Sequence, residues 1–294
     1  MRVFLTGATG YIGSAVAEAL RAAGHEVMGL ARSDAAARRL ASVGVQAVRG
    51  NLTDPAGVAS AARSADGVIH TASTNDAQAG AVDAALADAL LAALRGSGKP
   101  FLYTSGVWGY GDTGGRVLDE TSPRTPAPLV AWRAAVERRV IEAGHDSIRT
   151  VVIQPAIVYG RGGGIPAMLV RSAREEGAAR YVGSGENRWP TVHVDDLADL
   201  YVRALTGAPP GTMLLAANQA HPVKEIARAA SEGAGAGGRT VSWPLDQARQ
   251  ELGPFADALV LDQQVSAKRA EALLGWRPGR PEVLDDLRHG SYVR

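Results

Sequence analysis

The 294-residue sequence predicts an α/β fold in which helices cover both faces of a doubly wound parallel sheet. Two observations predict it. Short β-branched and apolar runs alternate with Ala-rich segments through the first half of the chain. The chain also opens with an apolar strand that leads through Gly7, Gly10 and Gly13 into an Ala-rich segment. Strands joined by helices in this way are expected to run parallel.

The three opening glycines have the spacing of a strand-to-helix turn that binds a dinucleotide. Gly7 permits the tight turn, Gly10 lets the backbone approach a pyrophosphate, and Gly13 lets the helix pack close to the strand. The free N–H groups of the first helical turn then face the phosphate charge. Ordinary turn and packing glycines are the alternative. The predicted pyrophosphate site comprises Thr6, Gly7, Thr9, Gly10, Tyr11, Ile12 and Gly13. The fold is therefore predicted to be of the Rossmann type.

The other elements of the N-terminal half follow in order. Strands are expected at Arg2–Thr6, Glu26–Ala31, Gln46–Arg49, Gly67–Ala72, Pro100–Thr104 and Thr150–Gln154. Helices are expected near 12–23, 34–42, 55–63, 76–95 and 130–143. The pair Asp54-Pro55 supplies an N-cap and a first-turn proline. The carboxyl ends of the strands should meet at one edge of the sheet, where we expect the ligand.

The second half of the chain is less regular. It contains helical patterns at 165–176 and His193–Leu205, a strand at Thr212–Ala217, and a last helix closed by Leu274-Gly275-Trp276. The prediction is a nucleotide-binding core in residues 1–155, completed by about 191–217. Residues 156–190 and 218–294 are expected to form a smaller, C-terminal substrate-binding lobe.

Composition excludes several classes of function. The formal net charge is +1, so nothing indicates a nucleic acid or a membrane surface as partner. Cysteine is absent, which fits a cytoplasmic protein. The six His residues have no ligand spacing, so no metal site is expected. No signal peptide and no apolar run of membrane-spanning length are recognised.

The second predicted strand is followed by Arg32. A site that prefers NAD usually has a carboxylate here, which accepts hydrogen bonds from the ribose 2′-hydroxyl. A guanidinium instead suits a 2′-phosphate by charge and bidentate geometry. The sequence therefore predicts NADP(H), although Asp34 lies close by and a solvated surface arginine is the alternative. Asn51 and Leu52 are expected to border the adenine. Thr71, Ala72 and Ser73 are expected beside the phosphates and ribose.

Several segments carry a family resemblance. They are TGATGYIG (6–13), GNLTD (50–54), VIHTAS (68–73), FLYTSGVWGYG (101–111), DETSP (119–123), QPAIVYGRGGG (154–164), VHVDDLADLY (192–201) and LLGWRP (273–278). These segments follow one another in the order found in the NAD(P)-dependent epimerase/dehydratase family. The chain therefore resembles an extended short-chain dehydrogenase/reductase of that family. The resemblance implies a catalytic Ser/Thr, Tyr and Lys, in which the Lys binds the ribose and lowers the Tyr pKa.

The sequence departs from this pattern because none of its seven Tyr has a Lys four residues later. Aligning the helix by Glu137 puts Leu129 in the Tyr position and Arg133 in the Lys position. Arg133 can supply charge and ribose hydrogen bonds but cannot act as a base. The Ser/Thr position falls on Thr104, with Ser105 next to it. The resemblance also extends the expected cofactor site to Arg133, Pro155 and Ile157.

Tyr110 is the first candidate for the missing proton donor, because it lies in the loop after the fifth strand. The expected substrate-binding residues are Trp108, Tyr110, Tyr159 and Trp189, whose aromatic side chains favour an apolar or planar substrate. The leading hypothesis is an NADP(H)-dependent oxidoreductase that acts on a carbonyl, C=N or C=C group of a small molecule. A non-redox epimerase or dehydratase and a non-catalytic NADP(H) sensor are the alternatives. A homodimer through the helices near 76–95 and 130–143 is a further expectation.

Overall fold

The computed structural model describes residues 1–293 and contains a central sheet of seven strands. All of its strand pairs are parallel. The strands lie in the order β10-β6-β5-β4-β1-β2-β3. Their bounds are β1 Arg2–Thr6, β2 Glu26–Ala31, β3 Gln46–Arg49, β4 Gly67–His70, β5 Pro100–Thr104, β6 Arg149–Pro155 and β10 Thr212–Ala216. The predicted Rossmann-type α/β fold is confirmed.

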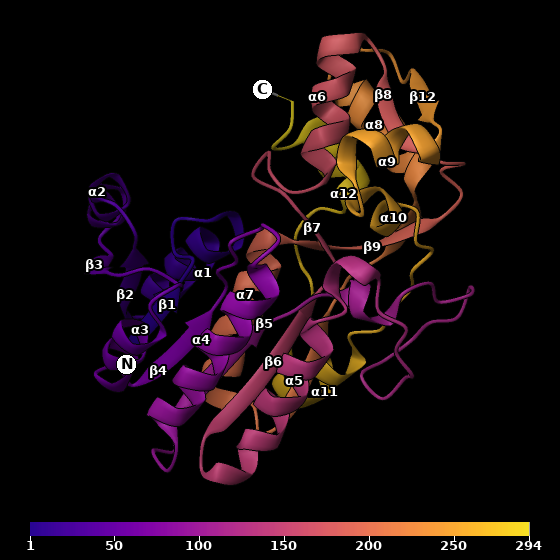
Figure 1. The fold of residues 1–294 in the computed structure, drawn as a ribbon. Helices are drawn as coiled ribbons and strands as arrows, with labels where there is room; N and C mark the ends of the chain where they lie inside the picture. Colours follow the sequence, from indigo (N-terminus) through magenta and orange to yellow (C-terminus); the bar gives the residue numbers. More distant parts are fainter. Residues whose placement is uncertain (294) are drawn as a thin grey trace.

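Helices cover both faces of this sheet (Figure 1). One face packs against α1 (Tyr11–Ala22), α2 (Asp34–Ser42), α7 (Val194–Gly207) and α11 (Lys268–Leu274). The other packs against α3 (Pro55–Arg63), α4 (Ala79–Leu94) and α5 (Arg133–Glu142). Each interface buries aliphatic side chains, and this burial is the main source of the stability of the core.

Local signals set several helix starts. The Ser33 side chain accepts a hydrogen bond from the Ala36 N–H at the start of α2, and Asp54 accepts one from the Gly57 N–H at the start of α3. Some expected boundaries were wrong by two or three residues, including the start of α4, which lies at Ala79. β4 ends at His70 rather than Ala72, and α5 begins only at Arg133, after the 3-10 turns of Val107–Tyr110 and Pro128–Val130.

The C-terminal lobe has its own core and lies to one end of the sheet (Figure 1). Its strands form two small sheets, β11-β9-β7 and β12-β8. They are β7 Ile157–Tyr159, β8 Ala179–Val182, β9 Arg188–His193, β11 Ala220–Pro222 and β12 Thr240–Trp243. Its helices are α6 Pro166–Glu176, α8 Val223–Gly233, α9 Leu245–Leu252, α10 Phe255–Leu259 and α12 Val283–His289. A further 3-10 turn, Ala143–Asp146, follows α5 and belongs to the nucleotide-binding core rather than to this lobe.

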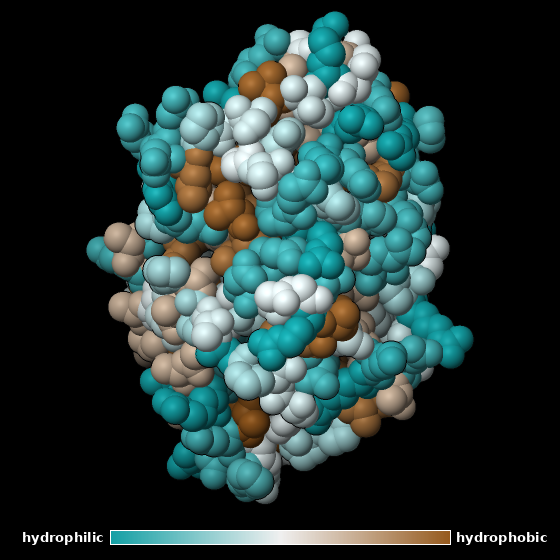
Figure 2. Space-filling model, turned by 90° about the vertical axis from the view of Figure 1, so that its right-hand side faces the viewer, coloured by the Kyte–Doolittle hydropathy of each residue, from teal (hydrophilic) through white to brown (hydrophobic). Residues whose placement is uncertain are grey.

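The molecular surface is largely hydrophilic on the face drawn in Figure 2, where hydrophobic atoms form separate areas. None of the helices within residues 1–293 combines the length and the apolar character needed to span a bilayer.

Candidate functional site

The glycine turn between β1 and α1 is packed against the end of β4. Gly7 has φ +77°, a conformation that favours glycine. A Cβ on Gly13 would lie 2.1 Å from the Gly7 carbonyl oxygen, so only glycine fits there. Gly10 is the N-cap of α1 without any side-chain cap, and the first turn of α1 has no acidic residue. The N–H groups of this turn are therefore suited to an anion.

A buried polar network lies beneath this turn. Thr6 Oγ1 lies 2.6 Å from His70 Nδ1, and His70 Nε2 lies 3.0 Å from Asp83 Oδ1. Tyr103 donates to the other oxygen of Asp83 at 2.5 Å. The Thr71 hydroxyl donates to the Thr6 carbonyl at 2.8 Å. The side chains of Thr6 and Thr71 thus support the turn, with their hydroxyls directed to protein partners.

The adenosine end of the predicted site lies at the edge formed by β2 and β3. The Arg32 side chain is exposed and forms no hydrogen bond or ion pair within residues 1–293. Asp34 instead pairs with Arg49 at 3.0 Å. Asn51 accepts from the Thr53 N–H at 3.2 Å, and Leu52 packs partly into the sheet face covered by α3 and α4.

A cavity of about 280 Å³ joins the glycine turn to the ends of β5 and β6. Its walls are mainly apolar and come from five separate segments of the chain. The lining residues are Tyr11, Ile12, Ser105, Gly106, Val107, Trp108, Val130, Arg133, Pro155, Ala156, Ile157, Val158, Gly164 and Ile165. The predicted residues Tyr11, Ile12, Ser105, Trp108, Arg133, Pro155 and Ile157 are therefore brought together in one place.

Arg133 is the cationic residue of the cavity wall. Its Nη1 donates to the Thr104 carbonyl at 3.0 Å, and its guanidinium lies 4.5 Å from the centre of the Trp132 ring. The hydroxyl of Thr104 lies 2.5 Å from that of the buried Tyr201. Thr104 therefore presents its carbonyl to Arg133 and its hydroxyl to the protein interior, while Ser105 lines the cavity.

Ser105 belongs to a network whose centre is the buried carboxylate of Glu137. Glu137 is 2% exposed, and it accepts hydrogen bonds from the Ser105 hydroxyl and from Arg124. Gln154 Nε2 donates to the same carboxylate at 3.1 Å. Since every contact donates to Glu137, the Ser105 proton is directed away from the cavity. Ser105 Oγ therefore offers a hydrogen-bond acceptor to a ligand.

Tyr110, expected as the proton donor, lies on the far side of this network. Its side chain is 1% exposed, and its hydroxyl donates to Gln154 Oε1 at 3.0 Å. Burial raises the pKa of Tyr110 to about 12. Tyr110 is not among the residues that line the cavity. The structure therefore contradicts its expected catalytic and substrate-binding roles, because the loop folds its ring inward.

Tyr159 and Trp189 are also separated from the cavity, contrary to expectation. The Tyr159 hydroxyl donates to the Pro281 carbonyl at 2.7 Å, and Trp189 Nε1 donates to the Leu259 carbonyl at 3.0 Å. Both side chains belong to the core of the C-terminal lobe. Of the four expected substrate-binding aromatics, the structure brings Trp108 to the cavity wall.

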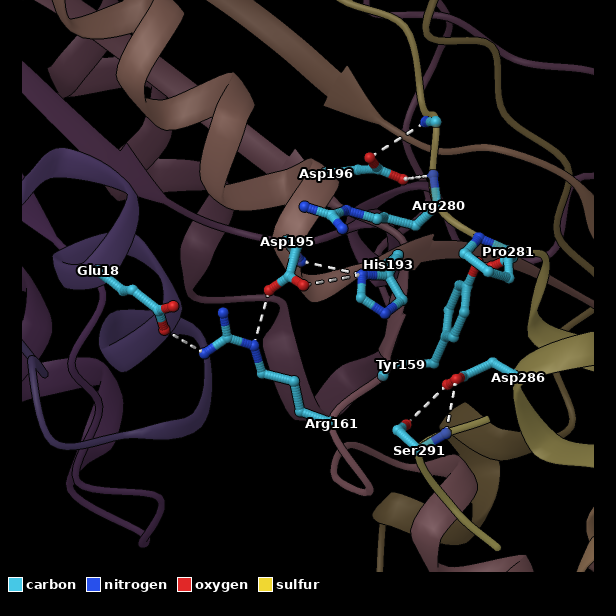
Figure 3. Close-up of polar contacts among 12 residues, drawn as sticks. Glu18, Tyr159, Arg161, His193, Asp195, Asp196, Arg280, Pro281, Asp286 and Ser291 are labelled. Carbon is cyan, nitrogen blue, oxygen red and sulfur yellow. Dashed lines mark hydrogen bonds and ion pairs between the residues drawn. The ribbon is translucent and has the colours of Figure 1, made fainter. Parts of the chain in front are cut away.

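The loop at residues 160–164 borders the cavity through Gly164 and contacts α1. Tyr11 donates to the Gly160 carbonyl at 2.8 Å. Figure 3 shows Arg161 between Glu18 of α1 and Asp195 of α7, at 2.8 and 2.7 Å. From the C-terminal side, the Tyr292 hydroxyl accepts from the Gly160 N–H at 2.9 Å and donates to the Gly163 carbonyl at 2.5 Å. The loop is thus tied to both lobes.

Sequence reasoning missed Arg124, Gln154 and the role of Glu137. The available signal was the position of two polar residues where apolar ones are the rule: Gln154 in a buried strand and Glu137 on the buried side of a helix. No group of His, Asp or Glu side chains suited to a metal ion exists within the described part of the chain.

The sheet order, the glycine turn and the cavity at the carboxyl ends of the strands define a Rossmann-type α/β protein. Residues 3–216 match the NAD dependent epimerase/dehydratase family, and the chain belongs to that family. An uncharacterised protein of Saccharomyces cerevisiae is 33% identical over 297 residues, which cover 98% of each chain. A 2-alkyl-3-oxoalkanoate reductase of Stenotrophomonas maltophilia is 30% identical over 72% of this chain and 67% of its own. The structure of a Thermus thermophilus UDP-glucose 4-epimerase in complex with NAD shares the fold, with a TM-score of 0.81, 24% identity and coverage of 98% and 99%.

Proposed function

We propose that the chain is an NADP(H)-dependent oxidoreductase that acts on a carbonyl, C=N or C=C group of a small apolar or planar molecule. The observation that carries the proposal is the cavity in which the first turn of α1 meets Ser105, Arg133 and an apolar wall. A dinucleotide fits the residues present, because the uncapped start of α1 suits a pyrophosphate and the exposed Arg32 suits a 2′-phosphate.

Two residues would handle the reacting group. Arg133 is a permanent cation and would stabilise negative charge that develops on the substrate oxygen. Ser105 directs its proton to Glu137 and would accept a hydrogen bond from the hydroxyl of the alcohol form. When bound, the nicotinamide supplies the hydride chemistry. Reduction of a carbonyl would also require a proton at its oxygen. The Tyr11 hydroxyl at the cavity wall already donates to the Gly160 carbonyl, so solvent water would supply that proton.

The names of two relatives support a redox reaction for this chain. The Stenotrophomonas maltophilia protein is named a reductase, as is a 28% identical NAD(P)H azoreductase of Xenophilus azovorans. Membership of the NAD dependent epimerase/dehydratase family favours the second candidate, a non-redox reaction on the same site.

NADPH consumption by the full chain over a panel of ketones, imines, enones and azo compounds tests the proposal. Arg133→Gln should lower the rate by roughly a hundred- to a thousandfold, because a group that stabilises the developing oxyanion is lost, and Ser105→Ala should lower it less. Arg138→Gln, an exposed charge on the same helix, is the control and should leave the rate unchanged. Product without net NADPH change would favour the epimerase or dehydratase. Tight NADPH binding without any turnover would favour a sensor.

A further inference from the structure

The edge of the sheet at which β2 and β3 end holds a second arginine that the proposed NADP(H) site does not yet use. In the parallel register, Ala31 at the end of β2 lies opposite Arg49 at the end of β3. Arg32 follows directly after Ala31, so both guanidiniums start from the same edge. Asp34 opens α2 between them, in a turn that is held by the Ser33 cap.

Of the two arginines at this edge, one forms an ion pair in the described residues and the other does not. Arg49 Nη2 lies 3.0 Å from Asp34 Oδ1, whereas Arg32 forms no ion pair within residues 1–293. A free carboxylate near this strand end would accept hydrogen bonds from a ribose 2′-hydroxyl, which favours NAD, and would repel a 2′-phosphate. Without Arg49, Asp34 would also be free to pair with Arg32, two residues away.

We propose that Arg49 is a cofactor-specificity residue that acts through Asp34. By holding the Asp34 carboxylate, Arg49 keeps Arg32 available for the 2′-phosphate and withholds the carboxylate from the 2′-hydroxyl of NAD. The inference rests on the proposed use of NADP(H). The discrimination between NADPH and NADH would then depend on Arg32, Asp34 and Arg49. Of these, Arg49 is a positioning residue that does not itself contact the cofactor.

The expected change in cofactor preference is small, because the Arg49–Asp34 ion pair is exposed to solvent. The side chains of Arg49 and Asp34 are 53% and 80% exposed, so water and salt screen their attraction. Exposed ion pairs of this kind contribute little, and we expect loss of Arg49 to lower the ratio of NADPH to NADH affinity by about threefold. The change should shrink as salt is added, because screening weakens the Arg49–Asp34 pair itself.

A double-mutant cycle on the full chain tests the inference. Dissociation constants for NADPH and for NADH are measured by nucleotide fluorescence for the wild type, Arg49→Gln, Asp34→Asn and the double variant. Arg63→Gln is the matched control, because Arg63 is an exposed arginine at the end of α3. Its carbonyl accepts from Lys99, which directly precedes β5, so it lies at the amino ends of the strands, away from the proposed cofactor site. All these positions are on the surface, so the variants should fold.

The expected result is that Arg49→Gln lowers the NADPH preference in the wild-type background and has no effect in the Asp34→Asn background. Arg63→Gln should leave the preference unchanged. An equal loss in both backgrounds would make Arg49 a direct phosphate ligand and overturn the inference, as would no loss in either. If the wild type shows no preference for NADPH over NADH, both the proposed cofactor and the inference are overturned. If the wild type prefers NADPH and Arg49→Gln keeps the same preference, only the inference is overturned.

Discussion

Replacement of Glu137 by Ala should destabilise the protein far more than the loss of one surface carboxylate. Glu137 is 2% exposed, and its partner Arg124 is 22% exposed. Removing one member of a fully buried ion pair costs about 3–5 kcal/mol, and the partial exposure of Arg124 lowers that cost. The buried Gln154 amide also loses its acceptor, which adds about 1–3 kcal/mol. We therefore expect a loss of about 4 kcal/mol in the free energy of unfolding.

Urea unfolding, followed by fluorescence and by circular dichroism, measures this loss. Glu142→Ala on the same helix is the control, since Glu142 is exposed, and it should change the free energy of unfolding by less than about 0.5 kcal/mol. The double variant Glu137→Leu with Arg124→Met should be more stable than Glu137→Ala, because no unpaired charge remains buried. A loss below about 1 kcal/mol for Glu137→Ala would refute the burial reasoning, because it would mean that water reaches the network.

Two further predictions concern the glycine turn and a buried histidine. Gly13→Ala should lower the free energy of unfolding strongly, since its Cβ would lie 2.1 Å from the Gly7 carbonyl oxygen. The Cβ of Gly10→Ala would lie 3.1 Å from the same oxygen, so this change should cost less stability and weaken NADPH binding. Urea unfolding and nucleotide titration measure the two effects separately. Burial lowers the pKa of His193 from its ordinary value of 6.5, so the folded state binds this proton less readily than the unfolded state and stability should fall as the pH drops below 6.5. His193→Asn keeps an acceptor for the Asp195 N–H, and its free energy of unfolding should fall less than that of the wild type between about pH 7 and pH 5. Urea unfolding at several pH values measures both, and equal losses in the two proteins would contradict the assignment.

The parts of the fold that the sequence predicts well are those with local causes. The bounds of α2 and α3 agree with the expectation because Ser33 and Asp54 cap their first turns. β8 and β12 were not foreseen, because they pair with each other across about 60 residues and neither has a strong strand signal of its own. Pairing at such separation depends on the packing of the whole lobe.

The candidate site shows the same division. The cofactor turn follows from three glycines within seven residues, so its geometry is local. Tyr110 was placed in the correct loop, but position along the chain does not determine which way a ring points, and this ring points into the core. Ser105, Glu137 and Arg124 come from three segments, and the hydrogen bonds that orient Ser105 exist only after these segments have packed together.

The ties between Tyr292 and the loop at residues 160–164 bear on how the protein is made. The glycine turn is synthesised long before Tyr292, because most of the sequence lies between them. A nascent chain can therefore form the glycine turn long before the loop beside the cavity is secured. Loss of the Tyr292 side chain should likewise loosen the loop beside the cavity, although most of the sequence separates Tyr292 from the glycine turn.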